Sequence, residues 1–462
     1  MLHIVVLAAG KGTRIKSALP KVLHRVAGAP MISHVIEAAA ALSPATVTVV
    51  VGHEAEQVRR ALAAHGGLRV VVQEPQLGTA HALLATETAL AGATGTLVLL
   101  SGDVPRVRAA TLQSLVQVHE AAGAAMTVAT AEVDDPAGYG RVVRDAAPGG
   151  EIARVVEDRD AAPEERSIRE INGGLYAFAL DGLFDALRAV AAANAQGEYY
   201  LPDLVALYRR QGRPVATLPV ECADDIRGVN SRKELAEVSR LVRMDKNDAL
   251  MAAGVTLEDP ATIYVDPGVR VGADTVIHPG VSLEGTTDIG EGCELHSGVR
   301  IVNSRLGARV VVYNHTVITD TVVGDDGRVG PFAHLRNEAT LAAGARVGNF
   351  VELKKTVLGA GSKAMHLAYL GDATIGARVN IGAGTITCNY DGETKQATVI
   401  EDGAFIGSDT QLVAPVTIGQ GAYVGTGTTV REDVPAGSLA VSAGAQRNIE
   451  GWTAKRRAKG KG

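Results

Sequence analysis

Aromatic residues are scarce in this chain, making up 3% of its 462 residues with a single Trp. A large core built from aromatic rings is therefore not expected, and 53 glycines instead indicate many tight turns. A basic excess is also lacking, because 51 acidic side chains outnumber 45 Lys and Arg residues and give a formal net charge of -6. Such a chain has no general basic field for nucleic acid, so we expect phosphate to be bound locally and no nucleic-acid partner.

Cysteines and long apolar runs are rare as well. Cys222, Cys293 and Cys388 are an odd number without a Cys-x-x-Cys pair, which supports neither a disulfide framework nor a thiolate zinc site. We therefore expect a reducing compartment, the cytoplasm. No stretch reaches the roughly 18 apolar residues of a membrane span, so no membrane association is expected. The first apolar run, 2–9, lacks a basic segment before it and is interpreted as a buried strand.

The length requires at least two domains, because single cores stop growing at roughly 250–300 residues. Apolar runs such as 47–51 and 97–100 alternate with helical patterns such as 30–42. This alternation predicts an α/β fold with a largely parallel, Rossmann-like sheet over residues 1–230. Ligands of such sheets bind at the carboxyl ends of strands, where the loops at Gly10, Gly78 and Gly102 begin.

A connecting helix is predicted at 231–250, where Ser231 and Glu234 form a capping box ahead of periodic apolar positions. From about residue 265 an aliphatic residue recurs at every sixth position. The clearest series is Ile406, Leu412, Ile418, Val424 and Val430.

Each hexapeptide of this repeat can supply one short strand and one turn of a three-sided prism. Residues 251–448 are therefore predicted to form a left-handed parallel β-helix of hexapeptide repeats. Its narrow interior accommodates short aliphatic side chains and explains why aromatic residues are scarce. Residues 449–462 are predicted to form a solvated, disordered basic tail.

The loop after the first strand places backbone N–H groups, Lys11 and Arg14 where a nucleotide phosphate could bind. It is not a Rossmann fingerprint, because Ile15 occupies the position of the third Gly, and it is not a P-loop. By itself the loop is also compatible with a tight turn that carries surface charges. Further motifs decide between the two interpretations. They are Leu19-Pro20-Lys21-Val22-Leu23, Gln73 with Gln76-Leu77-Gly78-Thr79-Ala80, Ser101-Gly102-Asp103, and Glu198-Tyr199-Tyr200-Leu201-Pro202-Asp203.

In this order and spacing the motifs resemble the sugar-nucleotide pyrophosphorylase family, which joins a nucleoside triphosphate to a sugar 1-phosphate. The resemblance implies that Gln73, Gly78 and Thr79 contact the uracil side and that Asp103 and Asn230 bind Mg²⁺. The implied nucleotide and sugar contacts are Leu7, Ala8, Ala9, Gly10, Arg14, Lys21, Gln73, Gly78, Thr79, Ser101, Gly102, Asp103, Gly140, Glu157, Asn172 and Asn230.

The chemistry requires such residue types, because the sugar phosphate and UTP are both anions and repel each other. A hard cation held by oxygen ligands and basic side chains such as Arg14 and Lys21 offset that charge. No covalent nucleophile is needed, since in-line phosphoryl transfer is mostly positioning and electrostatics. One departure from the family is Ser101, where relatives often have Tyr, so a stacking role is lost there.

The second half carries polar insertions that a plain prism does not require. They are Arg336, Gly348-Asn349-Phe350-Val351-Glu352-Leu353-Lys354-Lys355, the run from Gly361 to Asp372, and the run from Val379 to Gly392. Together with the first half they resemble the bifunctional N-acetylglucosamine-1-phosphate uridyltransferase/glucosamine-1-phosphate acetyltransferase family across nearly the whole chain. The resemblance implies two substrates beyond UTP, namely acetyl-CoA and a sugar 1-phosphate.

Within this family resemblance His366 is the general base that takes a proton from the sugar amine, a task that suits imidazole. The implied glucosamine 1-phosphate contacts are Arg336, Lys354, Tyr369 and Asn380, and the implied acetyl-CoA contacts are Ala383, Asn389, Tyr390, Ser408 and Thr426. Cys388 is not needed as a nucleophile. A departure occurs at Ala443, where relatives often have an Arg that meets the CoA phosphates.

Prism-forming acyltransferases of this kind are typically trimers, so a homotrimer is expected by resemblance. The main alternative is a monofunctional sugar-nucleotide pyrophosphorylase with a structural β-helix. A second alternative replaces UTP by a thymidine or adenosine nucleotide. His278, His296, His315 and His334 are scattered through the repeat and could line one face, but no zinc triad is apparent, so carbonic anhydrase-like metal binding is not expected.

Overall fold

The computed structural model describes residues 1–145, 150–442, 444 and 446–459. The chain divides into two compact units, Met1–Val242 and Arg243–Gly462. The division falls inside helix α7, Arg232–Ala252, in the region where the sequence predicts a connecting helix. Among the described residues, no helix is long and apolar enough to cross a membrane.

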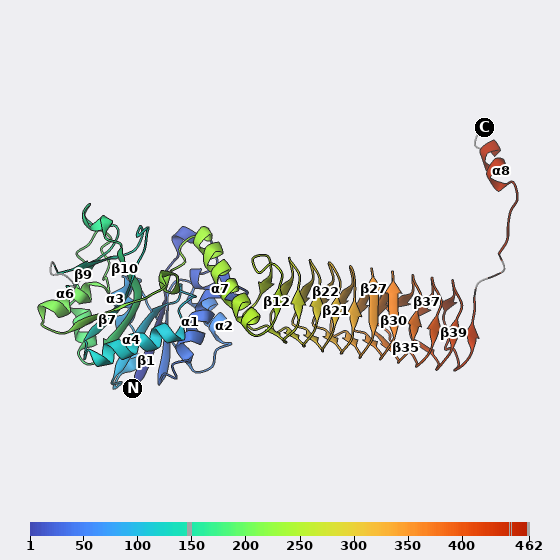
Figure 1. The fold of residues 1–462 in the computed structure, drawn as a ribbon, viewed down its shortest axis with the longest axis horizontal. Helices are drawn as coiled ribbons and strands as arrows, with labels where there is room; N and C mark the ends of the chain where they lie inside the picture. The colour runs from blue at the N-terminus through green and yellow to red at the C-terminus, as the bar shows by residue number, and fades with distance from the viewer. Residues whose placement is uncertain (146–149, 443, 445, 460–462) are drawn as a thin grey trace. The chain divides into compact units, whose positions relative to one another are not determined.

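The first unit is built around a nine-stranded sheet with the strand order β11-β7-β10-β6-β1-β4-β5, to which β8 and β9 are attached through β10. Strands β1, β7, β9 and β10 of this sheet are labelled in Figure 1. The strands of this unit are β1 Leu2–Ala8, β2 Arg25–Val26, β3 Ala29–Pro30, β4 Thr46–Val51, β5 Leu68–Val72, β6 Thr96–Ser101, β7 Met126–Glu132, β8 Arg141–Arg144, β9 Ile152–Val156, β10 Glu170–Ala179 and β11 Val215–Pro219. The helices are α1 Met31–Ala40, α2 Ala55–Leu62, α3 Thr79–Leu84, α4 Ala109–Ala121, α5 Leu183–Arg188 and α6 Asp203–Arg210.

The sheet is mixed, whereas the sequence predicts a largely parallel one. Strand β1 is parallel to β4 and β6, but β10 is antiparallel to both β6 and β7, and β8 is antiparallel to β9. No α-helix lies between β7 and β10 among the described residues. Parallel neighbours need a long crossover, usually through a helix, so strands joined without one can return antiparallel.

Both faces of this sheet are covered by apolar packing, because successive side chains of a strand point to opposite faces. In β1, Val5 belongs to one buried cluster, whereas Ile4 and Val6 belong to another. Strand β6 divides in the same way, with Leu99 in the first cluster and Leu100 in the second. The core therefore fixes the strands from two sides and leaves the loops at their carboxyl ends available for ligands.

Helix α7 begins with the predicted capping box. The Ser231 backbone N–H donates to Glu234 Oε2 at 2.8 Å, and the Glu234 N–H donates to Ser231 Oγ at 3.2 Å. These two bonds satisfy donors that the first turn of a helix leaves unpaired. Val238 of α7 is fully buried in a small apolar cluster with Ile15 and Met31, which anchors the first part of the helix in the first unit.

The second unit is a parallel β-helix whose strands form three faces, and its successive coils are visible in Figure 1. The first face contains β12 Thr256–Leu257, β15 Val276–Ile277, β18 Glu294–Leu295, β21 Val311–Val312, β24 Arg328–Val329, β27 Arg346–Asn349, β30 Lys363–His366, β33 Asn380–Ile381, β36 Phe405–Ile406, β39 Tyr423–Val424 and β41 Leu439–Ala440. The second contains β13 Tyr264–Val265, β16 Ser282–Glu284, β19 Arg300–Val302, β22 Val317–Thr319, β25 His334–Arg336, β28 Glu352–Lys354, β31 Tyr369–Gly371, β34 Ile386–Cys388, β37 Gln411–Val413 and β40 Thr429–Val430. The third contains β14 Arg270–Val271, β17 Asp288–Ile289, β20 Arg305–Leu306, β23 Val322–Val323, β26 Thr340–Leu341, β29 Val357–Leu358, β32 Ala373–Ile375, β35 Thr398–Ile400 and β38 Val416–Ile418.

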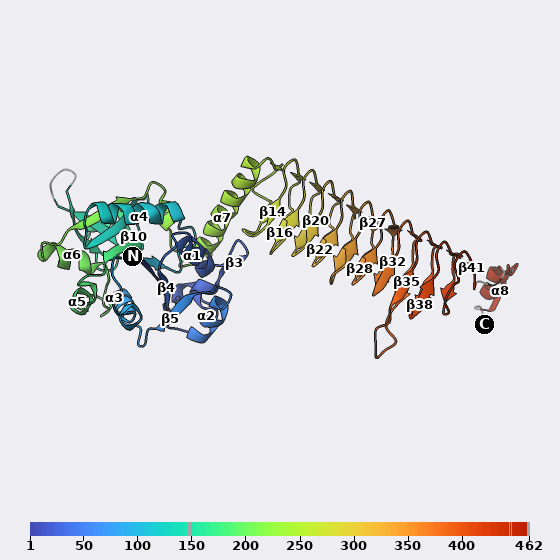
Figure 2. The same cartoon turned by 90° about the horizontal axis from the view of Figure 1, so that it is seen from below.

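The six-residue period predicted from the sequence is confirmed in the interior of this prism. The aliphatic positions of the repeat are buried in one continuous cluster, with Ile406, Leu412 and Ile418 fully enclosed. Val271, near the first coils, is the partly buried exception among the predicted series. Residues 389–397 leave the prism as a loop between β34 and β35 (Figure 2).

The carboxyl-terminal segment differs from the disordered tail that the sequence predicts. Helix α8 spans Trp452–Lys459, and the guanidinium carbon of Arg456 lies 5.1 Å from the centroid of the Trp452 ring. The two residues are one helical turn apart, and Ala, Lys and Arg are strong helix formers, so this segment stabilises a helix locally.

Candidate functional site

A cavity of about 460 Å³ lies where strands β1, β5 and β6 end. The residues predicted as nucleotide contacts that line it are Leu7, Ala8, Ala9, Gly10, Lys21, Gln73, Gly78, Thr79, Ser101 and Asp103. They come from four separate sequence motifs. The topology therefore brings these motifs to a single cavity at the edge of the sheet where α/β folds bind ligands.

Gly78 shapes one wall of this cavity. Its φ of +110° is a conformation that residues with a side chain rarely adopt, and a Cβ atom there would lie 2.6 Å from the Tyr199 carbonyl oxygen. The Gln73 side chain donates from Nε2 to the Gly78 carbonyl at 3.0 Å, and Thr79 Oγ1 accepts the Leu201 N–H at 3.0 Å. The Gln73–Thr79 loop is thus held against the segment that contains Tyr199.

A charged cluster lies beside the cavity. Lys21 pairs with the Asp103 carboxylate, and its Nζ also donates to Asn230 Oδ1 at 2.7 Å. Arg14 donates from Nη2 to the same amide oxygen at 2.8 Å. A backbone hydrogen bond also holds Asp103 and Asn230 close together. The N–H of Val229, the residue before Asn230, donates to the Asp103 carbonyl at 2.9 Å.

The oxygen atoms of Asp103 and Asn230 suit a hard cation. Carboxylate and amide oxygens are the ligands that Mg²⁺ prefers, and the Lys21 ammonium already draws one oxygen from each residue toward a single positive charge. The donor set therefore fits the metal that the sequence resemblance implies. Gly102, between Ser101 and Asp103, donates its N–H to the Leu7 carbonyl at 2.9 Å and ties β1 to this loop.

Gly140, Glu157 and Asn172 form a second cluster in this unit and do not line the cavity. The Asn172 N–H donates to the Gly140 carbonyl at 2.8 Å, and a Cβ atom on Gly140 would lie 3.3 Å from Glu157 Oε1. Asn172 also donates from Nδ2 to the Tyr176 hydroxyl at 2.7 Å. Burial raises the pKa of Glu157, and the negative charge of Asp160 adds to the effect.

Three polar residues that line the cavity were not among the contacts implied by the resemblance: Lys11, Gln76 and Glu198. Of these, the sequence by itself placed Lys11 where a nucleotide phosphate could bind. Each lies inside a motif that the sequence already exhibits, so their position next to predicted residues was an available signal. Glu198 is held at the cavity by its neighbour Tyr199, whose N–H donates to the Leu77 carbonyl at 2.8 Å.

In the prism, Arg336 and Lys354 occupy equivalent register positions on neighbouring strands β25 and β28. Each cation has an acidic partner on the following coil. Arg336 donates from Nε to Glu352 Oε1 at 2.7 Å, and Lys354 donates from Nζ to Asp372 Oδ2 at 2.9 Å. Glu352 and Asp372 were not among the predicted site residues, because their roles depend on the strand register.

The Lys354–Asp372 pair is the more enclosed of the two, with side-chain exposures of 10% and 12%. Its hydrogen bond with Asp372 raises the pKa of Lys354. Burial opposes ionisation of Asp372, but the bonds from Lys354 and Asn389 outweigh it and lower the pKa of Asp372. The proximity of the Lys354 ammonium lowers the pKa of Lys395.

Tyr369 and Asn389 adjoin this pair. A Cβ atom on Gly371 would lie 2.5 Å from the Tyr369 hydroxyl and 2.9 Å from Asn389 Nδ2, so both side chains approach the same point of β31. The Asn389 amide donates to Asp372. The structure therefore places Asn389, which the resemblance implies as an acetyl-CoA contact, next to the predicted phosphate-binding residues.

His366 lies at a corner of the prism in register with Asn349 of the preceding coil. Asn349 Oδ1 is 2.8 Å from His366 Nδ1. Because an amide oxygen only accepts, Nδ1 must carry the proton and Nε2 retains its lone pair. Asn349 was not among the predicted site residues, since nothing local in the sequence shows which group faces the ring.

The residues beyond His366 continue the same ladder on later coils. Ile381, Ile406 and Val424 pair across β33, β36 and β39, and Ala383, Ser408 and Thr426 each follow two positions after these residues. The Asp409 N–H donates to the Ala383 carbonyl at 2.7 Å, and the Gly427 N–H donates to the Ser408 carbonyl at 2.9 Å. Three predicted acetyl-CoA contacts thus form one line that extends from His366.

The remaining predicted residues lie around this line. Asn380 begins β33 and pairs with Lys363 and Phe405 on the neighbouring coils. Tyr390 is 60% exposed, and its hydroxyl donates to the Gly392 carbonyl within the loop 389–397. Ala443 lies outside the described residues.

Comparison with known proteins finds relatives for both halves of the chain. The sequence profile of the MobA-like NTP transferase domain matches residues 4–246, that of the GMPPB C-terminal domain matches residues 260–358, and bacterial transferase hexapeptide repeats match residues 397–432. The bifunctional protein GlmU of Pelobacter propionicus is 50% identical over 97% of this chain and 97% of its own length. Those of Pelotomaculum thermopropionicum and Geobacter sulfurreducens are 52% and 46% identical, each over 99% of both chains.

The chain belongs to the GlmU family. It is therefore a bifunctional enzyme, a uridyltransferase and acetyltransferase, as the sequence motifs of both halves predict. The alternative of a monofunctional pyrophosphorylase with an inert prism is thereby set aside. As an NTP transferase, this GlmU family member acts on small molecules, and enzymes of this class generally use a divalent metal.

Proposed function

We propose that the prism transfers the acetyl group of acetyl-CoA to the amine of glucosamine 1-phosphate. The first unit then joins the product, N-acetylglucosamine 1-phosphate, to UTP and releases UDP-N-acetylglucosamine and pyrophosphate. The observation that carries the first step is the Asn349–His366 pair, which fixes the imidazole tautomer in a prism corner. The observation that carries the second is the cavity beside Asp103 and Asn230.

In acetyl transfer, His366 Nε2 accepts a proton from the sugar amine as the nitrogen attacks the thioester carbonyl carbon. The new C–N bond forms, the C–S bond breaks, and the proton held by the imidazole neutralises the CoA thiolate. The bond from Nδ1–H to Asn349 stabilises the imidazolium that forms in between. No covalent acyl-enzyme is needed, so Cys388 has no chemical role.

Arg336 and Lys354 are proposed to bind the phosphate of glucosamine 1-phosphate. Both are held in place by carboxylates, Glu352 and Asp372, so their positions are set before substrate arrives. Tyr369 and Asn380 are proposed as further sugar contacts. The ladder of Ala383, Ser408 and Thr426 is proposed to bind acetyl-CoA mainly through backbone groups, with Asn389 and Tyr390 at its margin.

In uridylyl transfer, a phosphate oxygen of N-acetylglucosamine 1-phosphate attacks the α-phosphorus of UTP, and the bond to the β-phosphate breaks as pyrophosphate leaves. Asp103 and Asn230 would hold Mg²⁺, which supplies positive charge against the triphosphate. Arg14 and Lys21 reduce the remaining repulsion, and the Leu7–Gly10 backbone and Gln73, Gly78 and Thr79 position the nucleotide. Gly140, Glu157 and Asn172 are proposed to orient the sugar.

We also propose that the active form is a homotrimer located in the cytoplasm. Exposed apolar side chains adjoin the His366 ladder, with Phe350 following Asn349 at 57% exposure and Leu367 following His366 at 61%. Such a row favours burial against a second copy of the chain. Three cysteines without disulfides support a reducing compartment.

The test of this proposal measures thiol release from acetyl-CoA with glucosamine 1-phosphate, for the native chain and for His366→Ala. We expect the substitution to lower this rate by about 10²–10⁴-fold, the usual contribution of a general base. Mg²⁺-dependent release of pyrophosphate from UTP and N-acetylglucosamine 1-phosphate should remain unchanged in the variant. His334→Ala, which removes a histidine of the same prism, is the matched control.

An equal loss of both activities would show that His366 supports folding and would contradict its role as a base. Retention of thiol release in His366→Ala would contradict it directly. Competition between UTP and dTTP in the second assay decides the nucleotide, with preference for UTP expected.

A further inference from the structure

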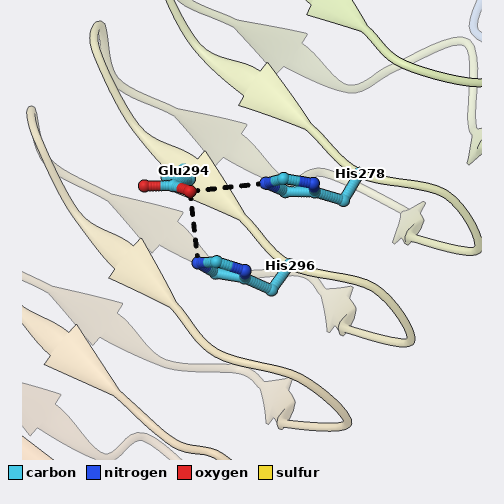
Figure 3. Close-up of side chains that lie close together, drawn as sticks. All are labelled: His278, Glu294 and His296. Atoms are coloured by element: carbon cyan, nitrogen blue, oxygen red, sulfur yellow. Dashed lines mark hydrogen bonds and ion pairs between the residues drawn. The ribbon is translucent and has the colours of Figure 1, made fainter.

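A cluster of side chains that could bind a metal ion lies on the first coils of the prism and includes no residue of the two sites described above. His278 and His296 follow the neighbouring strands β15 and β18, and Glu294 begins β18. One ligand atom from each of the three lies within 4.8 Å of the others. Figure 3 shows the two imidazole rings side by side with the Glu294 carboxylate directed at both. The sequence indicated that histidines scattered through the repeat could line one face, and the coils place these two next to each other.

The distances from Glu294 to the two imidazoles match the spacing between two ligands of one metal ion. Glu294 Oε1 is 3.4 Å from His278 Nε2 and 3.3 Å from His296 Nε2. Hydrogen bonds from ring N–H groups to oxygen are usually shorter, at about 2.9 Å. In contrast, ligand atoms at about 2.0–2.1 Å from a tetrahedral zinc ion lie about 3.3 Å from one another.

A fourth residue controls the protonation of one ligand. Glu258, one coil earlier, accepts from His278 Nδ1 at 2.9 Å through Oε2. This bond places the ring proton on Nδ1 and leaves the lone pair on Nε2, the atom next to Glu294. A carboxylate that accepts from the second nitrogen of a metal-binding histidine is a recurrent feature of zinc sites, because it fixes the ring and raises its basicity.

Neighbouring rings hold the second histidine. The His278 and His296 rings stack at 4.7 Å between centroids and 8° between planes, and Tyr313 stacks on the other side of His296 at 5.3 Å. The side chains of His278 and His296 are only 22% and 25% exposed. Parallel rings direct their lone pairs along parallel planes, so the two imidazoles must turn toward each other to bind one ion, and Glu294, at 46% exposure, remains accessible to that ion from solvent.

We propose that His278, Glu294 and His296 bind a divalent transition-metal ion of the zinc class, with Glu258 as the carboxylate that orients His278. Two imidazole nitrogens favour zinc or cobalt over Mg²⁺ or Ca²⁺, which prefer oxygen ligands. Three protein ligands leave one position for water, as in open zinc sites. The ion joins two successive coils of the prism and stabilises that end of the β-helix.

The experiment titrates Co²⁺ into the full chain after chelator treatment and dialysis, and records the visible absorption of the bound ion. We expect one equivalent to give the strong bands of a tetrahedral site and Zn²⁺ to abolish them. His278→Gln and His296→Gln should each weaken binding more than about 100-fold, and Glu258→Gln about 10–100-fold, as is usual for orienting carboxylates. Zn²⁺ should also raise the Tm of the native chain but not of His278→Gln.

Two controls separate this site from other metal binding. His334→Gln removes a histidine elsewhere on the prism and should leave the cobalt spectrum unchanged. Asp103→Asn removes a cation ligand of the first unit and should also preserve it. The proposal is overturned if the native chain gives no tetrahedral cobalt spectrum, or if His278→Gln and His296→Gln bind Co²⁺ as the native chain does.

Discussion

His366 and Asn349 show how a single contact can prepare a side chain for catalysis. The amide oxygen of Asn349 accepts only from a protonated Nδ1, so the contact selects the tautomer with a free Nε2. The ring also loses rotational freedom, since its partner is held on strand β27 of the adjacent coil. The base proposed for acetyl transfer is therefore positioned by a neighbour that is itself fixed by the register.

Asn349→Ala tests this positioning role. Loss of one hydrogen bond, worth about 0.5–1.5 kcal/mol, should lower kcat for acetyl transfer by about two- to tenfold, with little change in the KM for glucosamine 1-phosphate. Steady-state thiol release measures both constants, and Asn314→Ala on another coil is the control. An effect confined to KM would instead assign Asn349 to substrate binding.

At the scale of elements, three consecutive strands of one face carry the proposed phosphate site. Register pairs Arg336 of β25 with Lys354 of β28, and Lys354 with Gly371 of β31. The acid that neutralises Lys354 is Asp372, the residue after Gly371. A repeat of strands thus places unlike charges on neighbouring coils, where the low exposure of both side chains strengthens their attraction.

Asp372→Asn should destabilise the prism at neutral pH by about 3 kcal/mol, because Lys354 would remain buried without its counter-charge. The pH dependence follows from the lowered pKa of Asp372. Its contribution to stability is present above the pKa of the carboxyl in the unfolded chain and is lost as pH falls through the lower folded value. The free energies of unfolding that urea titrations give for the native and variant chains should therefore converge in acid.

Lys354 sets the alkaline limit of the pH range in which the Lys354–Asp372 pair stabilises the prism. Its raised pKa means that its contribution is present below the pKa of the unfolded lysine and is lost as pH rises through the higher folded value. If the free energy of unfolding of the native chain exceeded that of Asp372→Asn by the same amount at all pH values, this assignment would be contradicted. Glu393→Gln, in the exposed loop 389–397, is a control for removal of a carboxylate that does not neutralise a buried lysine.

For the whole molecule, assembly and acetyl transfer are expected to depend on the same surface. Phe332 and Phe350 stack at 5.5 Å between centroids, and Leu367 extends this exposed row to the residue beside His366. All three have positive φ, a conformation that bulky residues rarely adopt, and the prism corners hold them there with their side chains exposed. A row of this kind is a natural contact for a neighbouring prism.

Phe350→Asp should dissociate the proposed trimer, because it places a charge in a surface that is otherwise buried on assembly. Light scattering after size-exclusion chromatography measures the mass. We expect acetyl transfer to fall by at least about tenfold, while uridylyl transfer is retained. Val322→Asp, which charges an exposed apolar position on another face, is the control. An unchanged mass for Phe350→Asp would contradict the assignment of this surface.

The sequence alone determined the two-part organisation, the coil repeat and the motifs that line the cavity. These are local properties: a period of six residues sets which side chains enter a narrow prism, and a strand followed by a polar loop sets where a ligand binds in an α/β sheet. The buried series through Ile406 and the cavity at Gly10, Gly78 and Asp103 follow from such patterns. Tertiary structure was not needed to predict them.

Only the tertiary structure decided which distant groups meet. Asn349 and His366, and His278 with Glu294, become neighbours through strand register and coil length, neither of which is encoded in the local sequence around a single residue. The direction of β10 depends on the connection that precedes it, which the apolar pattern of the strand does not contain. Local periodicity specifies the elements, whereas register and connectivity specify the contacts from which a site is built.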